Sequence, residues 1–468
     1  MNSSDYNKEG SLLKNKPIKA TILESAYWEM DKDIGCQTFY FITYVNENFN
    51  IEILKESLKC VVKDIPILSC KFTKGYWRDR WVPIENFNIN QIIRTIRVDK
   101  KHFYDDAYSK FLQLKDKRLN LEKEPPLKVI VFYNEETEKK VIVFCTHHSF
   151  ADPRGNSYLI GLIGSYYNAL LHNKALKPKK IYRTLPKLIF SYGVIKAIKT
   201  FLKTETPSMD SYKPLIKMDF DDSNNGSGES IERLIIRKED LKKLKLYYKD
   251  YGFTINDIIL YFTLKLTNKY NMNLKEPSSH ACLSIGIDLR GYIKDDVLTI
   301  TNYAGRDFFT VDLKDADDLP GFAKKLKAFR EKQEGIGNVM SFVSISMFPI
   351  AIQKKIWKSA VGNSLKEWSL RTLVTTNVGK LDDFVKPFGD AVEDISIAMS
   401  FPYSGLPVIS ASGYKDTLTL YFTKFNDKNG LTQKVKNDFN ELLNEILFYS
   451  DLKLNSKQVV DELEGVIH

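Results

Sequence analysis

The stretch KKVIVFCTHHSFADPRG, residues 139–155, decides the fold of this chain. Its five apolar residues at 141–145 are typical of a strand that is buried on both faces. Beyond this stretch, apolar residues recur at helical spacing, namely Tyr158, Leu159, Leu162, Ile163, Tyr166, Leu170 and Leu171. His147, His148 and Asp152 therefore lie where a buried strand ends and a helix begins. In α/β proteins, ligands bind at this carboxyl edge of the strands.

Strand and helix patterns alternate along the rest of the chain, which predicts an α/β fold. Further strands are expected at 36–45, 68–73, 127–133, 232–236, 281–287 and 373–376. Helices are expected at 51–62, 107–119, 185–203, from 238, at 255–266 and at 431–446. Thr254 and Asp257 have the spacing of a helix N-terminal cap. At 417–423, apolar residues alternate strictly with threonine and tyrosine, which predicts a half-buried strand.

The length of the chain predicts two domains, because 468 residues exceed one ordinary hydrophobic core. Between 204 and 230 the composition shifts to Pro, Ser, Asp, Asn and Gly. We therefore expect a linker at 204–230 that joins an N-terminal subdomain at 1–203 to a C-terminal subdomain at 231–468.

The charge and cysteine content narrow the class of partner. The chain carries 69 Lys and Arg against 59 Asp and Glu, and the excess of +10 is spread along its length. This suits an anionic small molecule or an acidic carrier protein, whereas no nucleic-acid-binding motif is present. The five cysteines are scattered without a CxxC pair. Neither a disulfide framework nor a zinc cage is expected, and a reducing cytoplasm is the predicted location.

Two segments bear on membrane contact. The N-terminus lacks the apolar core of a signal peptide, and residues 335–353 contain too many Gly and Ser residues for a transmembrane helix. We expect the latter to be a buried segment or the wall of a substrate tunnel. Residues 185–203 form a basic amphipathic segment. A surface helix that covers the core is favoured there over a helix that lies on a membrane, and peripheral membrane contact stays open.

The histidine pair admits three interpretations from spacing alone. Adjacent residues at a strand end point to opposite faces, so one histidine of the two is expected to face a given cavity and act as a general base. Asp152 and Pro153 are equally typical of a helix start, as N-cap and first helical residue. A metal site at His148 and Asp152 would need a third ligand, and no metal is expected.

The flanking segments point to a known family. HHSFADPRG resembles the HHxxxDG motif of the condensation-domain and CoA-dependent acyltransferase superfamily, which shares the chloramphenicol acetyltransferase fold. The segments AYWEM and DIPILSCKF are similar to that family's start, and LNLEKEPPLKVIVF is similar to its segment before the histidine strand. SIGIDLRGYI and TTNVGKLD resemble its later strand ends, in the same order. The resemblance covers nearly the whole chain.

The resemblance implies two chloramphenicol acetyltransferase-like subdomains, each with a mostly antiparallel or mixed sheet and flanking helices, arranged as a V around a tunnel. His148 would be the general base that deprotonates a small-molecule hydroxyl or amine as it attacks a thioester. Asp152 would pair with Arg290 and hold the histidine loop, and His147 would be a packing residue beside the catalytic one. No permanent cofactor is implied. The co-substrate would be acyl-CoA, as in the stand-alone alcohol acetyltransferases, or a phosphopantetheine thioester on a carrier protein.

Two points of the resemblance stay open. Thr376, Asn377 and Gly379 are candidates for donors to the oxyanion by position, but a strand-end cap explains them equally. Pro153 stands where the family motif has glycine, and proline has no backbone N–H. The alternatives to a CoA-dependent acyltransferase are condensation of carrier-bound acyl or aminoacyl thioesters, and a non-catalytic homologue that binds an acyl group or a partner protein.

Overall fold

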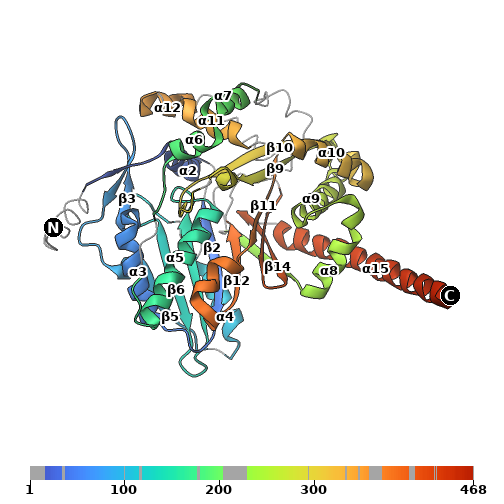
Figure 1. Cartoon of the computed structure of the whole chain (residues 1–468), viewed down its shortest axis with the longest axis horizontal. Coiled ribbons are helices and arrows are strands. Elements are labelled where there is room, and N and C mark those ends of the chain that lie inside the picture. The colour runs from blue at the N-terminus through green and yellow to red at the C-terminus, as the bar shows by residue number, and fades with distance from the viewer. Residues whose placement is uncertain are drawn as a thin grey trace.

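The chain folds into two lobes, each built on one sheet with helices against it (Figure 1). The computed structural model describes residues 16–466 except 34–36, 100, 115–118, 177–179, 204–228, 294, 333–334, 346–347, 358–371, 400–405, 426 and 428–429. The sheet of the first lobe has the strand order β12 (Val392–Met399), β2 (Thr38–Val45), β7 (Lys140–His147), β6 (Leu127–Tyr133) and β5 (Ile93–Arg97). Its neighbours pair antiparallel, apart from the parallel pair β5 and β6.

The sheet of the second lobe is mixed. Its order is β10 (Ala304–Asp312), β9 (His280–Asp288), β11 (Thr372–Lys380), β13 (Val408–Tyr414), β14 (Thr417–Phe425) and β8 (Glu229–Ile236). Strand β11 runs parallel to both of its neighbours, and the outer pairs are antiparallel. A third, small sheet joins β1 (Ile18–Lys19), β4 (Arg80–Pro83) and β3 (Cys70–Thr73).

The first-lobe sheet is buried on both faces, as the apolar run at 141–145 predicts. Ile142 and Phe144 of β7 belong to the core under α3 (Ile51–Asp64) and α5 (Pro153–Leu171). Val141 and Val143 belong to a second core, which α4 (Phe103–Leu114) covers. Because successive strand residues point to opposite faces, a strand between two helical layers is apolar at most positions on both faces.

The other helices cover the second lobe and the top of the molecule. The second-lobe helices are α8 (Lys238–Tyr247), α9 (Ile255–Asn271), α10 (Leu319–Glu331) and α15 (Leu431–Val466). Helix α9 begins with the capping box of Thr254 and Asp257, which confirms the predicted cap. At the top lie α2 (Ile22–Asp33), α6 (Leu185–Tyr192), α7 (Val194–Lys203), α11 (Ile336–Ile345) and α12 (Ile350–Trp357) (Figure 1).

Strand β12 links the two lobes. It comes late in the chain but adds to the edge of the first-lobe sheet, where Ile395 is paired with Thr43 of β2. It is followed by β13 and β14, which return to the second sheet. The sequence pattern did not indicate this exchange. The division into 1–203, 204–230 and 231–468 stays a prediction, and residues 204–228 of the expected linker lie outside the described residues.

The half-buried strand predicted at 417–423 is wrong in one respect. Thr419, Tyr421 and Thr423 on its polar face are as buried as the apolar residues between them. Strand β12 covers this face, and the hydroxyls of Tyr421 and Ser396 lie 2.9 Å apart in a hydrogen bond. The polar residues therefore face the seam between the lobes instead of solvent.

Two other expectations need correction. The single helix expected at 185–203 is divided into α6 and α7 at Gly193, whose φ of +100° is incompatible with a continuous helix. The uncharged segment 335–353 is buried only in part. Ile336 and Val339 of α11 are buried, whereas Phe348 and Ile352 are exposed by 50% and 45%.

Candidate active site

His147 is the last residue of β7 and is held in a structural environment. Its side chain is 1% exposed, and its Nδ1 accepts a hydrogen bond of 3.0 Å from the backbone N–H of Ser149. The ring proton therefore lies on Nε2, which is 3.5 Å from the carboxylate of Asp31 in α2. This ring stabilises the turn after β7 and lies close to α2.

The ring of His148 is oriented by Asn302, from the segment that precedes β10. The side-chain amide of Asn302 donates to the carbonyl oxygen of His148 over 2.9 Å. Because the amide nitrogen is used in this way, the Asn302 oxygen faces the ring and lies 3.0 Å from Nδ1. An oxygen can only accept here, so Nδ1 carries the proton and Nε2 carries the lone pair.

The surroundings of His148 keep the imidazole neutral. Burial, together with the positive charge of Arg306 and the neighbouring His147, lowers the pKa of His148 to about 3. A backbone hydrogen bond and the hydrogen bond to Asn302 raise the pKa, but burial outweighs them. At neutral pH the ring is therefore uncharged, with its single proton on Nδ1 and a free lone pair on Nε2.

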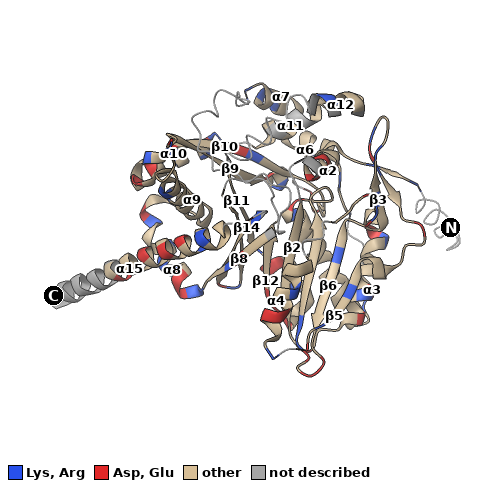
Figure 2. Cartoon of the chain, turned by 180° about the vertical axis from the view of Figure 1, so that it is seen from behind, with Lys and Arg blue, Asp and Glu red and all other residues tan. Residues whose placement is uncertain are grey.

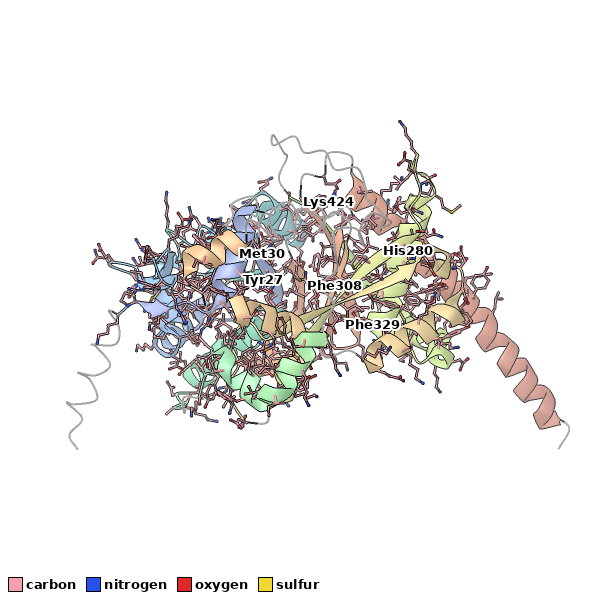
Figure 3. The ribbon with its side chains drawn as sticks, turned by 90° about the horizontal axis from the view of Figure 1, so that it is seen from above. Tyr27, Met30, His280, Phe308, Phe329 and Lys424 are labelled. Carbon is pink, nitrogen blue, oxygen red and sulfur yellow. The ribbon has the colours of Figure 1, made fainter. Side chains whose placement is uncertain are left out.

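Tyr27 of α2 covers one face of this imidazole. The two rings stack with their centroids 3.5 Å apart and an interplanar angle of 14°. Phe39 of β2 packs against the ring of His148 at 4.8 Å. Burial raises the pKa of the Tyr27 phenol to about 12, so it stays neutral. Figure 3 shows Tyr27 and Met30 of α2 facing the middle of the molecule, toward Phe308 of the second lobe.

Asp152 and Arg290 join the start of α5 to the second lobe. The ion pair is bidentate, with contacts of 2.9 Å to Oδ1 and 3.0 Å to Oδ2 of Asp152. Asp152 is fully buried and Arg290 is 8% exposed. Oδ1 also accepts from the N–H of Gly155, and Oδ2 accepts from the N–H of Tyr303. Asp152 is thus the N-cap of α5 and an interlobe anchor at once.

Arg290 also binds the carboxylate of Asp288 at 3.1 Å, the Thr299 hydroxyl at 2.8 Å, and backbone carbonyls in the segment that carries Asn302. Its guanidinium donates to the carbonyl oxygens of Thr299 and Thr301, at 3.0 and 2.7 Å. The segment 299–303 is therefore bound by three residues. Arg290 binds its backbone carbonyls, Asp152 accepts the N–H of Tyr303, and His148 bonds with the side chain of Asn302. Pro153 is the first residue of α5, a position where a missing N–H leaves no hydrogen bond unmade.

The candidate oxyanion residues lie at the end of β11. Asn377 accepts the N–H of Gly379 through its side-chain oxygen over 2.8 Å, and Gly379 has a φ of +80°. Arg154 of α5 donates to the carbonyl oxygen of Val378 over 3.1 Å. This strand end, which includes Thr376, therefore lies beside the start of α5 and is stabilised by a local cap. The assignment of Thr376, Asn377 and Gly379 as oxyanion donors stays a prediction.

Three further residues act on His148, namely Tyr27, Asn302 and Arg306. Sequence reasoning assigned none of them a role. Tyr27 lies in the AYWEM segment, which was recognised only as a family-like start. Asn302 and Arg306 lie in an unremarkable stretch before and within β10. They act on His148 across the seam, so only the packing of the two lobes brings them there.

A cavity of about 390 Å³ lies at the start of α2. Its walls include Thr21 and Ser25 beside α2 and within it, Leu185 and Ile189 of α6, and Arg78. The tunnel expected at His148 stays a prediction. Among the described residues there is no group of His, Cys, Asp and Glu suited to hold a metal ion. No helix in the described part of the chain combines the length and apolar character needed to cross a bilayer.

Comparison with solved structures identifies the fold. The chain is similar to the epimerization domain from the third module of tyrocidine synthetase B, with 14% identity, a TM-score of 0.63, and coverage of 93% of this chain and 97% of that chain. It is also similar to a trichothecene 15-O-acetyltransferase from Fusarium sporotrichioides, with 12% identity, a TM-score of 0.62, and coverage of 92% and 95%. A third similar structure is the starter condensation domain of rhizomide synthetase in complex with C8-CoA and Leu-SNAC, with 9% identity, a TM-score of 0.58, and coverage of 94% and 96%.

These comparisons confirm the resemblance at the level of the fold. The chain has the two-lobed fold of these epimerization and condensation domains and of the acetyltransferase. No protein-family profile matches the chain, and no curated protein matches it in sequence.

Proposed function

We propose that this protein is an acyltransferase that moves an acyl group from a thioester to a hydroxyl or amine. The observation that carries the proposal is the state of His148: a neutral imidazole at the seam, with its proton held on Nδ1 by Asn302 and its lone pair on Nε2. With the proton held on Nδ1, Nε2 is the atom of this ring that can accept a proton from an acceptor hydroxyl or amine.

In the proposed reaction, Nε2 of His148 removes the proton of the acceptor as its oxygen or nitrogen attacks the thioester carbonyl carbon. The tetrahedral intermediate collapses with cleavage of the C–S bond, and the imidazolium returns its proton to the leaving thiolate. A free thiol and an ester or amide result, and His148 is regenerated. Asp152 and Arg290 act as positioning residues, because they fix the segment that carries Asn302.

The proposed donor is acyl-CoA, with a phosphopantetheine thioester on a carrier protein as the alternative. Two observations support a thioester donor in general: the fold is that of an acetyltransferase and of condensation domains, and one of the similar structures holds C8-CoA. The net charge of +10 also suits the phosphates of either donor. Substrate access to Nε2 is expected beside Tyr27, whose ring occupies one face of the imidazole.

The test measures thiol release by the purified chain, with acetyl-CoA and octanoyl-CoA as donors and a panel of alcohols and amines as acceptors. We expect acceptor-dependent release that falls by about 10²–10⁴ in His148→Ala, which is the usual contribution of a general base. His172→Ala is the matched control, because this histidine lies exposed at the end of α5 and its removal should leave the rate unchanged.

The outcome also separates the alternatives. Turnover with an acylated carrier protein but not with either acyl-CoA would select carrier-dependent condensation. Binding of an acyl-CoA without turnover, or turnover that survives His148→Ala, would instead select a non-catalytic or mechanistically different homologue.

A further inference from the structure

Helix α7 carries an apolar surface that faces away from the molecule. Ala197 is fully buried against the body of the protein, next to α11. On the outer side, Ile195 and Leu202 are exposed by 72% and 77%. Val194 and Ile198 are exposed as well. With 3.6 residues per turn, positions 194, 195, 198 and 202 fall within one continuous arc of the helix.

A row of lysines lies directly beside this arc. Lys196, Lys199 and Lys203 follow each other at spacings of three and four residues and occupy the adjoining arc of α7. The helix sequence VIKAIKTFLK contains no acidic residue. In Figure 2, α7 accordingly carries basic positions and no acidic ones. The helix thus has three sides: one packed on the protein, one apolar and exposed, and one basic.

Other exposed apolar residues lie on elements at the same end of the molecule. Phe190 of α6 is exposed by 72%, and Phe348 and Ile352 beside and within α12 are also exposed. Both views of the chain place α6, α7 and α12 at the same end of the molecule (Figures 1 and 2). Lys187 of α6 is engaged by Asp295 and is not counted here. We define the α7 face as Phe190, Val194, Ile195, Ile198 and Leu202 with the three lysines of α7.

We propose that the α7 face docks on an anionic lipid surface. An interfacial helix inserts its apolar side among the lipid acyl chains while adjacent lysines meet the charged headgroups, and the two arcs of α7 have this arrangement. The only charges of α7 are its three lysines, and their positive charge is complementary to an anionic bilayer. A protein partner would need its own apolar groove beside an acidic strip, and nothing on this face selects such a shape. The proposal does not depend on the acyl-transfer activity.

The test is co-sedimentation of the full chain with vesicles. One set contains phosphatidylcholine alone, and the other contains equal parts of phosphatidylcholine and phosphatidylserine. We expect binding to the anionic vesicles only. The double variant Ile195→Ser/Leu202→Ser should lower the apparent affinity about tenfold or more, because it removes the inserted side chains. The double variant Lys199→Gln/Lys203→Gln should lower it to a similar degree and remove its dependence on salt.

Matched controls separate this face from general surface effects. Met272→Ser removes an apolar side chain that is 73% exposed on the second lobe. Lys324→Gln/Lys327→Gln removes two exposed lysines of α10 at similar helical spacing. Both controls should bind the anionic vesicles as the unmodified chain does. All the substituted side chains are exposed, so the thermal unfolding of every variant is expected to be unchanged.

Three results would overturn the proposal. They are failure of the unmodified chain to bind anionic vesicles, equal binding to vesicles of phosphatidylcholine alone, and equal loss of binding in the α10 lysine control. The first would point to a protein or another part of this chain as the occupant of the face.

Discussion

At the scale of single residues, the state of His148 follows from three neighbours that lie far away in the chain. Asn302 sets the tautomer, Tyr27 covers the ring, and Arg306 disfavours the imidazolium. Each of these effects acts on the ring of His148, whose own sequence position specifies only that it directly follows a strand. The chemistry of the site is therefore a property of the seam between the lobes.

The depressed pKa of His148 predicts a pH-dependent stability. In the unfolded chain the imidazole takes up a proton below its ordinary pKa of 6.5, whereas in the folded chain it does so only near 3. The unfolded state binds more protons between these values, so the free energy of unfolding should fall as the pH is lowered through this window. The slope from this one group reaches about 1.4 kcal/mol per pH unit. Urea unfolding at a series of pH values measures it.

The control for this prediction is substitution of the ring itself. His148→Phe should remove this part of the slope, and the surface variant His172→Phe should retain it. An unchanged slope in His148→Phe would mean that His148 takes up protons equally in the folded and unfolded chains.

The Asp152–Arg290 pair predicts a large loss of stability when one partner loses its charge. Asp152→Asn leaves the buried guanidinium with only the half-exposed carboxylate of Asp288, so the loss should approach the roughly 3–5 kcal/mol seen when a buried pair is broken. The free energy of unfolding from urea titration measures the loss. Glu52→Gln breaks the exposed pair between Glu52 and Lys55 and should change stability by less than about 1 kcal/mol. Equal effects of the two variants would contradict the structural role of the buried pair.

At the scale of elements, the start of α5 is where the site residues of the two lobes contact each other. Asp152 caps the helix, Pro153 begins it, and Gly155 allows the Thr301 segment to approach closely. A Cβ at Gly155 would lie 2.6 Å from the carbonyl oxygen of Thr301 and 3.0 Å from Nη2 of Arg290. The close approach therefore requires glycine at position 155. The HHxxxDG motif, which HHSFADPRG resembles, has its glycine two residues earlier, where this chain has Pro153.

Gly155→Ala is expected to push the Thr301 segment away from α5. The destabilisation should be about 1–3 kcal/mol, as for other overpacked sites, and thiol release should fall because Asn302 moves with the segment. Urea unfolding and the thiol assay measure the two effects. Gly291→Ala is the control, since a Cβ there meets no atom within 4 Å. If Gly155→Ala behaves like Gly291→Ala, the segment is not held by close packing on α5.

At the scale of the whole molecule, β12 and β14 hold the lobes together. Strand β12 completes the first sheet, and the buried polar face of β14 packs against it. Tyr421 lies in the same apolar cluster as Phe111 of α4, so residues of the second sheet contribute to a core of the first lobe. The seam is therefore built as part of the fold and not as a loose contact between domains.

The hydrogen bond between Tyr421 and Ser396 tests this seam. Tyr421→Phe removes the hydroxyl that bonds Ser396 across the seam and also interacts with Arg233, and should lower the free energy of unfolding by about 1–3 kcal/mol. Tyr248→Phe is the matched control, because the buried hydroxyl of Tyr248 has no hydrogen-bond partner among the described residues. Its removal is expected to be neutral or stabilising. Similar losses in both variants would show that the hydrogen bond across the seam is not the source of the effect.

The sequence by itself determined the local elements and the principal site residues. The apolar run at 141–145 identifies a strand covered on both faces, and the resemblance of HHSFADPRG and SIGIDLRGYI to known family segments points to His148, Asp152 and Arg290. The strand could be predicted because an unbroken apolar run leaves no face for solvent, and the helix start because a strand end followed by a cap and proline has few alternative structures.

The tertiary structure alone decided which distant residues surround the imidazole. Asn302 is 154 residues from His148, and β12 joins the first sheet from the other half of the chain. The threonines and the tyrosine of β14 have the pattern of a solvent-facing side, yet they are buried at the seam. Periodicity along a strand shows that two faces differ, but it does not show what covers them. Only the packing of the lobes supplies that information, and with it the tautomer and low pKa of His148.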